Sequence, residues 1–403
     1  MPTAELSRRS FLHSVAAVTA FSASGFAQET NRNPNQNDEV QLSQIHGSSE
    51  QDEKAPGPFL PPDERVGFAI VGLGRLSLNQ ILPAFGHSQY CKPVALVSGD
   101  RDKASKIAAQ YAIAASAIYD YANFDQLARN PEVKVIYVVL PNGMHEEYVT
   151  RGAKAGKQIL CEKPMATSSR EAERMISTCK EAKVKLMIAY RQQYEPHNRA
   201  LRQLVTEGKL GALRGFVSSN SQQQGDPTQW RLKKSLSGGG CLPDVGLYCL
   251  NASRFLSGEE PTDVSATIFQ PKDDPRFTEV EASCSFSLKF PSGYVATCAT
   301  SYDVHKSQFL RLEGTKAWAE MSPSYGYHGN HLKWSHLDGE RETEIVPQIE
   351  EKDQFALEMD HFAECVLEGK TPHTPGEEGL KDHQIIEALY ESARTSRIVS
   401  VSV

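Results

Sequence analysis

Residues 66–78 read VGFAIVGLGRLSL, an apolar run that ends in a glycine turn. This order predicts a buried strand, a tight turn and the start of a helix; Gly72 permits the turn and Gly74 lets the backbone approach a pyrophosphate. Ser77 stands where such turns usually carry a third glycine or an alanine, and it is still small enough for the helix to pack closely on the strand. The stretch therefore predicts the first unit of a dinucleotide-binding fold.

The segments that follow alternate between apolar strands and helices. The run VKVIYVVLP at 133–141 is rich in β-branched residues, as expected of a strand covered on both faces. Because strands and helices alternate, residues 65–190 are predicted to form an α/β domain with a doubly wound parallel sheet of the Rossmann type.

The pattern changes in residues 191–403. Short alternating runs such as YVATCATSY predict a C-terminal α+β domain with a large open antiparallel sheet. Two helical segments, 355–369 and 378–396, close the chain and are expected to pack back on the first domain.

The N-terminal segment carries an export pattern. Arg8 and Arg9 precede a modest apolar stretch and a small-residue exit that ends at Ala27, which predicts that residues 1–27 are a twin-arginine signal peptide. Residues 28–64 are rich in Asn, Gln, Asp, Glu, Ser and Pro and are expected to form a flexible arm. The expected location is the periplasm, where the protein would arrive already folded.

Composition excludes several classes of function. The 403 residues carry a net charge of −7 and no basic run, which argues against a nucleic-acid partner. No apolar run beyond the leader reaches the roughly 20 residues of a membrane span, so no membrane anchor is expected. None of the eight cysteines forms a C-x-x-C pair, so no metal site is expected and buried free thiols are favoured over disulfides.

The end of the second predicted strand indicates the cofactor. NAD enzymes usually place an acidic residue there, whereas this chain has Ser98 and Gly99. These small residues leave room for a 2′-phosphate, and Arg101 and Lys103 can supply positive charge, although both also suit a solvated helix start. Asp100 comes two residues too late and could point to solvent. NADP is therefore favoured over NAD.

Two further segments carry groups suited to hydride transfer. Lys163 follows a predicted strand, at the edge where doubly wound sheets bind ligands, and its cation can stabilise a developing alkoxide. Asp244 and Tyr248 are four residues apart and so share one face of a helix. A tyrosine beside a lysine can remove a hydroxyl proton, and Asp244 can orient the sugar or the lysine. Taken singly, each pattern is more typical of an ordinary surface than of a catalytic site.

Taken together, these motifs resemble the glucose–fructose oxidoreductase family within the larger Gfo/Idh/MocA group. The matching stretches cover nearly the whole chain after the arm and include CEKPMATS, KLMIAYR, QWRL and GGG-x-L-x-D-x-G-x-Y. Many members of the wider group carry His where this chain has Tyr248, and the tyrosine follows the glucose–fructose oxidoreductase pattern. The stretch Cys241-Leu242-Pro243 departs from the family, and Pro243 leaves the identity of the sugar open.

The resemblance implies roles for the matching positions. Lys163, Asp244 and Tyr248 would be the catalytic residues, with Tyr248 as the acid–base. The residues implied around NADP are Gly72, Gly74, Arg75, Leu76, Ser98, Lys103, Asn142, His145, Glu162, Lys163, Arg191, Trp230, Arg231 and Tyr327. The resemblance also implies a homo-oligomer, a dimer or a tetramer built through the open sheets, with the N-terminal arm lying across a neighbour's cofactor.

The expected activity is oxidation of an aldose such as glucose to its lactone, and reduction of a second sugar such as fructose on the same tightly bound NADP, in a ping-pong cycle. Two alternatives stay open within the same chemistry, an NADP-dependent aldose dehydrogenase and an aldose–aldose oxidoreductase. A third alternative, of another class, is a non-catalytic sugar- or nucleotide-binding protein, because a fold alone does not determine function.

Overall fold

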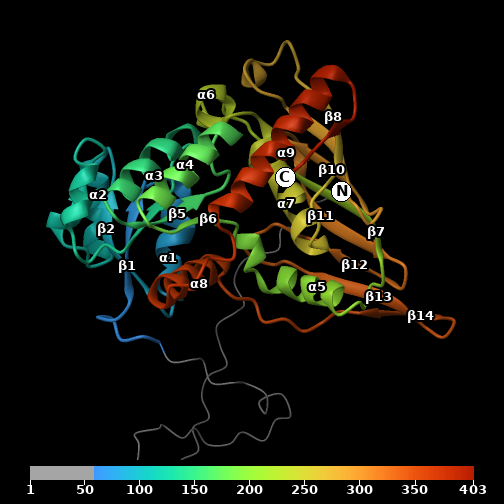
Figure 1. Ribbon diagram of the computed structural model, residues 1–403, viewed down its shortest axis with the longest axis horizontal. Coiled ribbons are helices and arrows are strands. Elements are labelled where there is room, and N and C mark those ends of the chain that lie inside the picture. The colour runs from blue at the N-terminus through green and yellow to red at the C-terminus, as the bar shows by residue number, and fades with distance from the viewer. Residues whose placement is uncertain (1–58) are drawn as a thin grey trace, which may run out of the picture. The chain divides into compact units, whose positions relative to one another are not determined.

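The computed structural model describes residues 59–403 (Figure 1), so the predicted signal peptide and most of the predicted arm lie outside the described residues. The first sheet has six strands in the order β3-β2-β1-β4-β5-β6, and every pair is parallel. Its strands are β1 (Val66–Val71), β2 (Cys91–Val97), β3 (Ile118–Tyr119), β4 (Val135–Val138), β5 (Gln158–Glu162) and β6 (Leu186–Ala189). This is the predicted doubly wound parallel sheet, and β1 and β4 are buried along their whole length.

Helices connect these strands. They are a π-helical turn η1 (Ser77–Ile81) that runs into α1 (Leu82–Ala84), then α2 (Arg101–Gln110), α3 (His145–Lys154) and α4 (Ser169–Glu181). Two of them, α2 and α4, begin at a side chain that caps the helix. Short 3₁₀ turns lie at η2 (Ala115–Ala117), η3 (Phe124–Arg129), η4 (Asn142–Met144) and η5 (Arg191–Gln193). The Ser168 hydroxyl accepts the N–H of Glu171 at 3.3 Å, which fixes the start of α4.

The second sheet has nine strands in the order β14-β13-β12-β11-β7-β10-β9-β8-β15. They are β7 (Leu213–Gln223), β8 (Asp263–Phe269), β9 (Ser283–Lys289), β10 (Val295–Ser301), β11 (Asp303–Gly314), β12 (Ala317–Met321), β13 (Leu332–Asp338), β14 (Arg341–Ile345) and β15 (Val399–Ser400). This is the predicted large antiparallel sheet, with one parallel pair within it, β7 and β10. β7 comes first in the chain and is inserted between β10 and β11, so it meets β10 without a hairpin between them.

One face of this sheet is packed and the other is open. Along β10 the side chains alternate between exposed and buried, the period expected when one face is covered. The remaining helical segments of this part are α5 (Pro196–Thr206), η6 (Trp230–Leu232), α6 (Lys234–Ser237), the π-helical turn η7 (Leu242–Gly246), α7 (Leu247–Ser257) and η8 (Pro275–Phe277). Helix α7 packs on β7 and β10. Tyr248, near the start of α7, lines the same cavity as Lys163, which follows β5 of the first sheet.

The last two helices tie the sheets together, as the sequence predicts. Helix α8 (Gln354–Glu368) packs against β2 and η5 of the first part of the chain. Helix α9 (Gly376–Thr395) packs on α4 and β6 at one end and on β8 at the other, and Figure 1 shows it passing between the two sheets. The last two helices therefore pack on elements of both parts of the structure.

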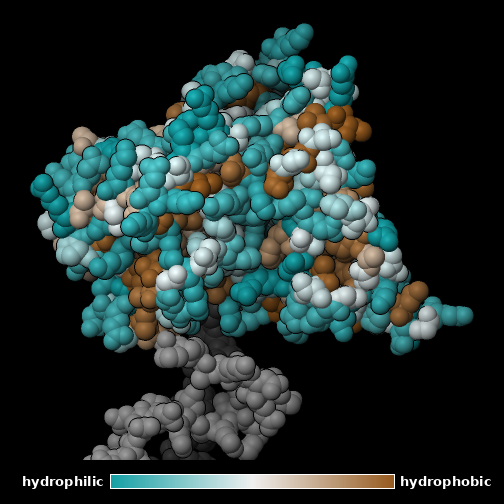
Figure 2. All heavy atoms as spheres, in the orientation of Figure 1, coloured by the Kyte–Doolittle hydropathy of each residue, from teal (hydrophilic) through white to brown (hydrophobic). Residues whose placement is uncertain are grey.

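The cysteines and the surface agree with the composition. All eight cysteines are buried and have free thiols, as predicted. The face in Figure 2 is mostly hydrophilic, with apolar side chains in small separate areas. Within residues 59–403, no helix combines the length and hydrophobicity needed to cross a membrane.

Candidate functional site

A cavity of about 830 Å³ lies between the carboxyl ends of the first sheet and the second sheet. Its wall carries six cationic side chains and three acidic ones, in a chain whose net charge is −7. The cations are Arg75, Lys103, Lys163, Arg191, Arg231 and Lys306, and the acids are Asp100, Glu162 and Asp244. This surplus of positive charge favours a ligand with several phosphates.

The glycine turn forms one end of the cavity. Gly72 has φ +94°, and a Cβ there would lie 2.3 Å from the carbonyl oxygen of Val139, so only glycine fits. A Cβ on Gly74 would meet nothing within 4 Å, which leaves the backbone open for a ligand to approach. The Ser77 hydroxyl donates to the Gly72 carbonyl at 2.6 Å and locks the turn. The turn thus has the close-approach geometry that a pyrophosphate requires.

The end of β2 follows the turn along the same wall. Ser98 is 5% exposed, and its hydroxyl accepts the N–H of Asp100 at 3.1 Å. The Asp100 carboxylate caps α2 by accepting the N–H of Lys103 at 2.9 Å, although the side chain also borders the cavity. Lys103 lines the cavity, whereas Arg101 directs its guanidinium to the carbonyl of Ile118 at 3.4 Å. Of the two predicted cations, only Lys103 is placed to meet a 2′-phosphate.

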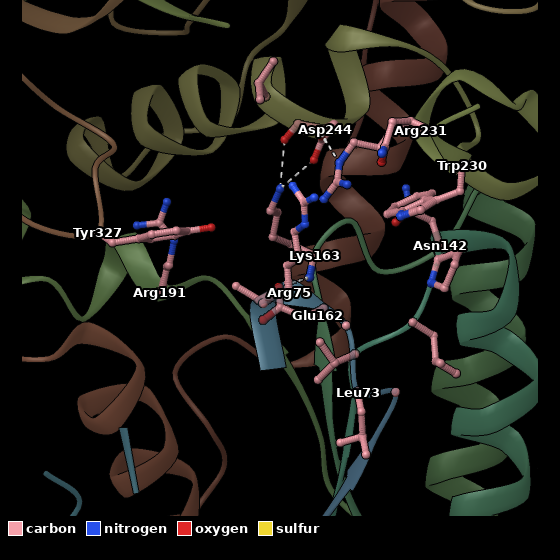
Figure 3. Close-up of a pocket in the computed structure, with 18 of the residues that line it drawn as sticks. Leu73, Arg75, Asn142, Glu162, Lys163, Arg191, Trp230, Arg231, Asp244 and Tyr327 are labelled. Carbon is pink, nitrogen blue, oxygen red and sulfur yellow. Dashed lines mark hydrogen bonds and ion pairs between the residues drawn. The ribbon is translucent and has the colours of Figure 1, made fainter. Parts of the chain in front are cut away.

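The other end of the cavity is built around Asp244, in the π-helical turn η7. Lys163, directly after β5, donates from Nζ to the Asp244 backbone carbonyl at 2.9 Å and to Oδ1 at 3.1 Å. Arg231 Nε donates to Oδ2 at 3.0 Å, and the Tyr302 hydroxyl donates to the same oxygen at 2.5 Å. Figure 3 shows the side chains of Lys163 and Arg231 both pointing toward Asp244.

These contacts determine the charges of the cluster. Burial alone would raise the pKa of Asp244, but the charges of Lys163 and Arg231 and the hydrogen bond from Tyr302 outweigh it and hold that pKa well below its usual value. Burial also acts to lower the pKa of Lys163, and the neighbouring Tyr248 and Asp244 raise it on balance. At neutral pH the cluster is therefore a carboxylate with a lysine cation and an arginine cation.

Tyr248 stands beside this cluster, four residues after Asp244 at the start of α7. The Nζ atom of Lys163 lies 4.5 Å from the centroid of its ring, and the guanidinium carbon of Arg191 lies 4.9 Å from it. Arg191 also lies 4.6 Å from the ring centroid of Tyr327, so it stacks beside both tyrosines. Two cations thus stand beside the ring of Tyr248, which lines the cavity.

The other predicted residues are placed as follows. Asn142 lines the cavity and donates to the Ser237 carbonyl at 2.8 Å, which joins the two parts of the chain. Trp230 lines the wall with Arg231 over its ring at 4.5 Å. Glu162 is 7% exposed and accepts a hydrogen bond from a buried tyrosine, Tyr137, at 2.8 Å. With one exception, every predicted site residue borders this single cavity.

The exception is His145, for which the prediction of a cofactor contact is wrong. Its ring is fully buried and does not line the cavity. Nε2 lies 2.8 Å from the carbonyl of Leu140, and Nδ1 lies 3.1 Å from the carbonyl of Pro164 and 3.2 Å from that of Met165. His145 therefore ties the loop after β4 to the loop that follows Lys163.

Sequence reasoning missed several residues of the cavity wall, most of them in the second sheet and the loops beside it. The cavity also contains Tyr121, Asn220, Gln222, Lys306, Gln308, Tyr325 and Phe355, and Tyr302 contacts Asp244 directly. No local signal marks Tyr302, which follows β10 in a segment that reads only as an alternating strand. Among residues 59–403 no group of three or more His, Cys, Asp or Glu is arranged to hold a metal ion.

Comparison with known proteins places this architecture in a family. The model "Oxidoreductase family, NAD-binding Rossmann fold" matches residues 66–190, and the model "GFO/IDH/MocA C-terminal domain" matches residues 198–320. A D-xylose 1-dehydrogenase [NADP(+)] of Haloarcula marismortui is 36% identical over 344 residues, which cover 84% of this chain and 93% of the relative. A D-xylose 1-dehydrogenase (NADP(+)) of Haloferax volcanii is 29% identical over 338 residues, which cover 83% and 99%.

A crystal structure of an aldose–aldose oxidoreductase from Caulobacter crescentus, complexed with glycerol, is 41% identical and superposes with a TM-score of 0.81. The match covers 84% of this chain and all of that one. The two family models together match more than half of the chain, and the chain belongs to the GFO/IDH/MocA family of oxidoreductases.

Proposed function

We propose that the protein is an NADP-dependent sugar oxidoreductase that oxidises an aldose at its anomeric carbon and passes the hydride to a second sugar. The observation that carries the proposal is the Lys163–Asp244–Arg231 cluster beside Tyr248, in the same cavity as the glycine turn. The relatives named as NADP(+)-dependent D-xylose 1-dehydrogenases and the structure named as an aldose–aldose oxidoreductase support this class of reaction.

NADP fits the residues of the cavity. The turn at Gly72 and Gly74 suits the pyrophosphate, and Ser98 with Lys103 suits the 2′-phosphate, because no acidic side chain ends β2. Arg75 adds a further positive charge along this wall, beside that of Lys103. When bound by these residues, NADP would supply the hydride-accepting and hydride-donating group of the reaction.

The protein's own residues move the proton. As the anomeric C–H bond breaks, the hydroxyl on the same carbon must lose its proton, and Tyr248 in its phenolate form accepts it, giving a lactone. The Lys163 cation, 4.5 Å from the ring, stabilises the phenolate, and Asp244 holds Lys163 in that place. In the second half of the cycle Tyr248 returns the proton to the carbonyl oxygen of the accepting sugar.

A second candidate is an NADP-dependent aldose dehydrogenase that releases its cofactor after each turnover. The 36% identity to a D-xylose 1-dehydrogenase [NADP(+)] favours it. The two candidates share every chemical step at Tyr248 and differ only in whether the reduced cofactor leaves. A ketose such as fructose and an aldose are both proposed as acceptors, and the relative named as an aldose–aldose oxidoreductase supports the aldose.

We also propose export to the periplasm and retention of NADP. The Arg8-Arg9 pattern supports a twin-arginine route, which carries folded proteins and so allows the cofactor to be loaded in the cytoplasm. Since the periplasm offers no NADP pool, the enzyme must regenerate the cofactor in place, and the arm at 28–64 is proposed to help retain it. These segments lie outside the described residues, apart from the last part of the arm.

Self-association is proposed through the open face of the second sheet. Val217 on β7 is 42% exposed and Val295 on β10 is 40% exposed, and both point away from the packed face. Light scattering of wild-type protein and of a Val217→Lys variant tests this, since a lysine on a shared face should lower the measured mass. An unchanged mass would place any interface elsewhere.

Initial-rate kinetics test the proposed reaction. With no nucleotide added, rates measured with donor and acceptor sugars varied should give parallel lines in reciprocal plots, as a ping-pong cycle requires. Intersecting lines, or a strict requirement for added NADP, would favour the dehydrogenase. No turnover with any aldose, with or without NADP, would contradict both.

A further inference from the structure

A buried polar array adjoins the cavity wall where β4 and β5 meet α8. The hydroxyl oxygen of Tyr137 lies 2.8 Å from Oε1 of Glu162 and 3.1 Å from Oε1 of Glu358. Tyr137 and Glu358 are fully buried and do not line the cavity, whereas Glu162 does. The carboxyl groups of Glu162 and Glu358 therefore meet at the hydroxyl of Tyr137, and Glu162 directly precedes Lys163 in the chain.

Counting protons shows that one of these carboxyls is neutral. A phenol has a single O–H proton and donates it to one acceptor at a time. If both carboxyls were ionised, one carboxylate oxygen would face a lone pair of Tyr137 at hydrogen-bond distance with no proton between them. Burying such an unpaired charge is strongly unfavourable, so the array must hold a second proton on one carboxyl.

The surroundings assign that proton to Glu358. The second oxygen of Glu162 accepts the N–H of Lys163 at 3.3 Å. Burial raises the pKa of Glu162, and the hydrogen bond from Tyr137 and the charges of Lys163 and Arg191 act in the opposite direction, toward the ionised form. The second oxygen of Glu358 is buried and, within residues 59–403, has no hydrogen-bond partner. The charged or titratable groups that act on Glu358 are Glu162, Tyr137, Arg191 and Asp353. Burial first, and then the charge of Glu162, raise the pKa of Glu358 well above its usual value.

We propose that Glu358 is a neutral acid that donates to Tyr137, and that Tyr137 in turn donates to Glu162, which keeps that carboxylate ionised and fixed in the wall beside Lys163. Tyr137 and Glu358 are then positioning residues for the site. Moving each proton one step along this chain leaves Glu358 ionised and Glu162 neutral, with no proton entering or leaving. The array thus lets the charge of the cavity wall change without exchange with solvent. The role in turnover rests on the proposed function, whereas the protonation state does not.

Infrared difference spectroscopy of the ligand-free protein tests the protonation state. At neutral pH Glu358→Gln should remove a C=O band of a protonated carboxylic acid, and Tyr137→Phe should keep the band but shift it, because the acid loses its hydrogen-bond acceptor. The matched control is Glu368→Gln, an exposed position on the same helix, which should remove only ionised carboxylate absorption. Loss of ionised carboxylate absorption in Glu358→Gln would overturn the proposal.

The pH dependence of kcat/KM tests the positioning role. Tyr137→Phe removes a hydrogen bond to ionised Glu162, so the pKa of Glu162 should rise, and the acid limb of the profile should move up by roughly one to two pH units. Glu358→Gln should leave that limb in place, because its amide can still donate to Tyr137. If Tyr137→Phe lowers kcat/KM but leaves the acid limb of its pH profile in place, Tyr137 has only a packing role, which would contradict the proposal. If the protein oxidises no sugar, the infrared result still decides the state of Glu358.

Discussion

The two ends of the cavity are built in different ways. The nucleotide end comes from two short continuous segments, 72–76 and 98–103, in which each side chain is close in sequence to a glycine. The catalytic end consists of long side chains from distant segments, with Lys163, Arg231 and Tyr302 all converging on Asp244. Changes at the first end should therefore alter which nucleotide binds, and changes at the second should remove turnover.

Tyr248→Phe should have the largest effect on rate. It keeps the ring and its contacts with Lys163 and Arg191 but removes the proton acceptor, which is typically worth roughly 10²–10⁴-fold in rate. Single-turnover reduction of NADP by an aldose measures the chemical step, and NADP binding should be unchanged. Near-full turnover in this variant would remove Tyr248 from the mechanism.

Asp244→Asn should weaken both activity and stability. The substitution leaves Lys163 and Arg231 without their carboxylate, and breaking a buried pair of this kind costs roughly 3–5 kcal/mol; the lower figure is expected here because Arg231 is 35% exposed. Urea unfolding measures the loss of free energy of unfolding, and kcat should fall because Lys163 is no longer held beside Tyr248.

The same pair predicts a pH dependence. Since the folded pKa of Asp244 is depressed, its contribution to stability is fully present above the unfolded pKa of about 4 and is lost only as pH falls through the lower folded value. The difference in free energy of unfolding between wild type and Asp244→Asn should therefore be constant from neutral pH to about pH 5 and narrow below that. A difference that disappears near pH 6 would contradict this assignment.

Ser98→Asp should change nucleotide choice and leave the chemistry intact. A carboxylate at the end of β2 would repel the 2′-phosphate and could accept hydrogen bonds from ribose hydroxyls, so the ratio of kcat/KM for NADP over NAD should fall by on the order of 100-fold. Equal use of NAD and NADP by the unmodified protein would contradict the reasoning before any variant is made.

Tyr302→Phe should have the smallest effect of the four substitutions. It removes one of the donors to Asp244 but leaves Lys163 and Arg231 in place, so kcat should fall by about tenfold, the equivalent of a hydrogen bond to a charged group. Tyr294→Phe is the matched control, because its hydroxyl is buried without a hydrogen-bond partner among residues 59–403. Equal losses in both variants would mean that packing, and not the bond to Asp244, is responsible.

The same contrast explains what could be predicted from sequence. The glycine turn and the end of β2 are local patterns, so the fold of the first sheet and the positions of Gly72, Ser98 and Lys103 follow from neighbouring residues. Lys163 and Asp244 were found because each lies in a recognisable motif. The contact between them depends on the tertiary fold and cannot be read from their spacing along the chain.

The remaining features depend on contacts between distant segments. Tyr302 is 58 residues from Asp244, and Glu358 is 221 residues from Tyr137, so no pattern within a segment marks either contact. His145 was assigned wrongly because its motif position does not say whether the ring faces the cavity or the core. The parallel pairing of β7 with β10 likewise depends on the order of strands in space and not on their alternation.

The absorbance spectrum of the protein purified without added nucleotide tests the central claim most directly. The account predicts that the protein carries NADP, that an aldose alone produces the absorbance of reduced nicotinamide once per site, and that a second sugar removes it. In Tyr248→Phe the same cofactor should be present but stay oxidised on the same timescale. Protein that carries no nucleotide, or bound NADP that no aldose reduces, would contradict the account.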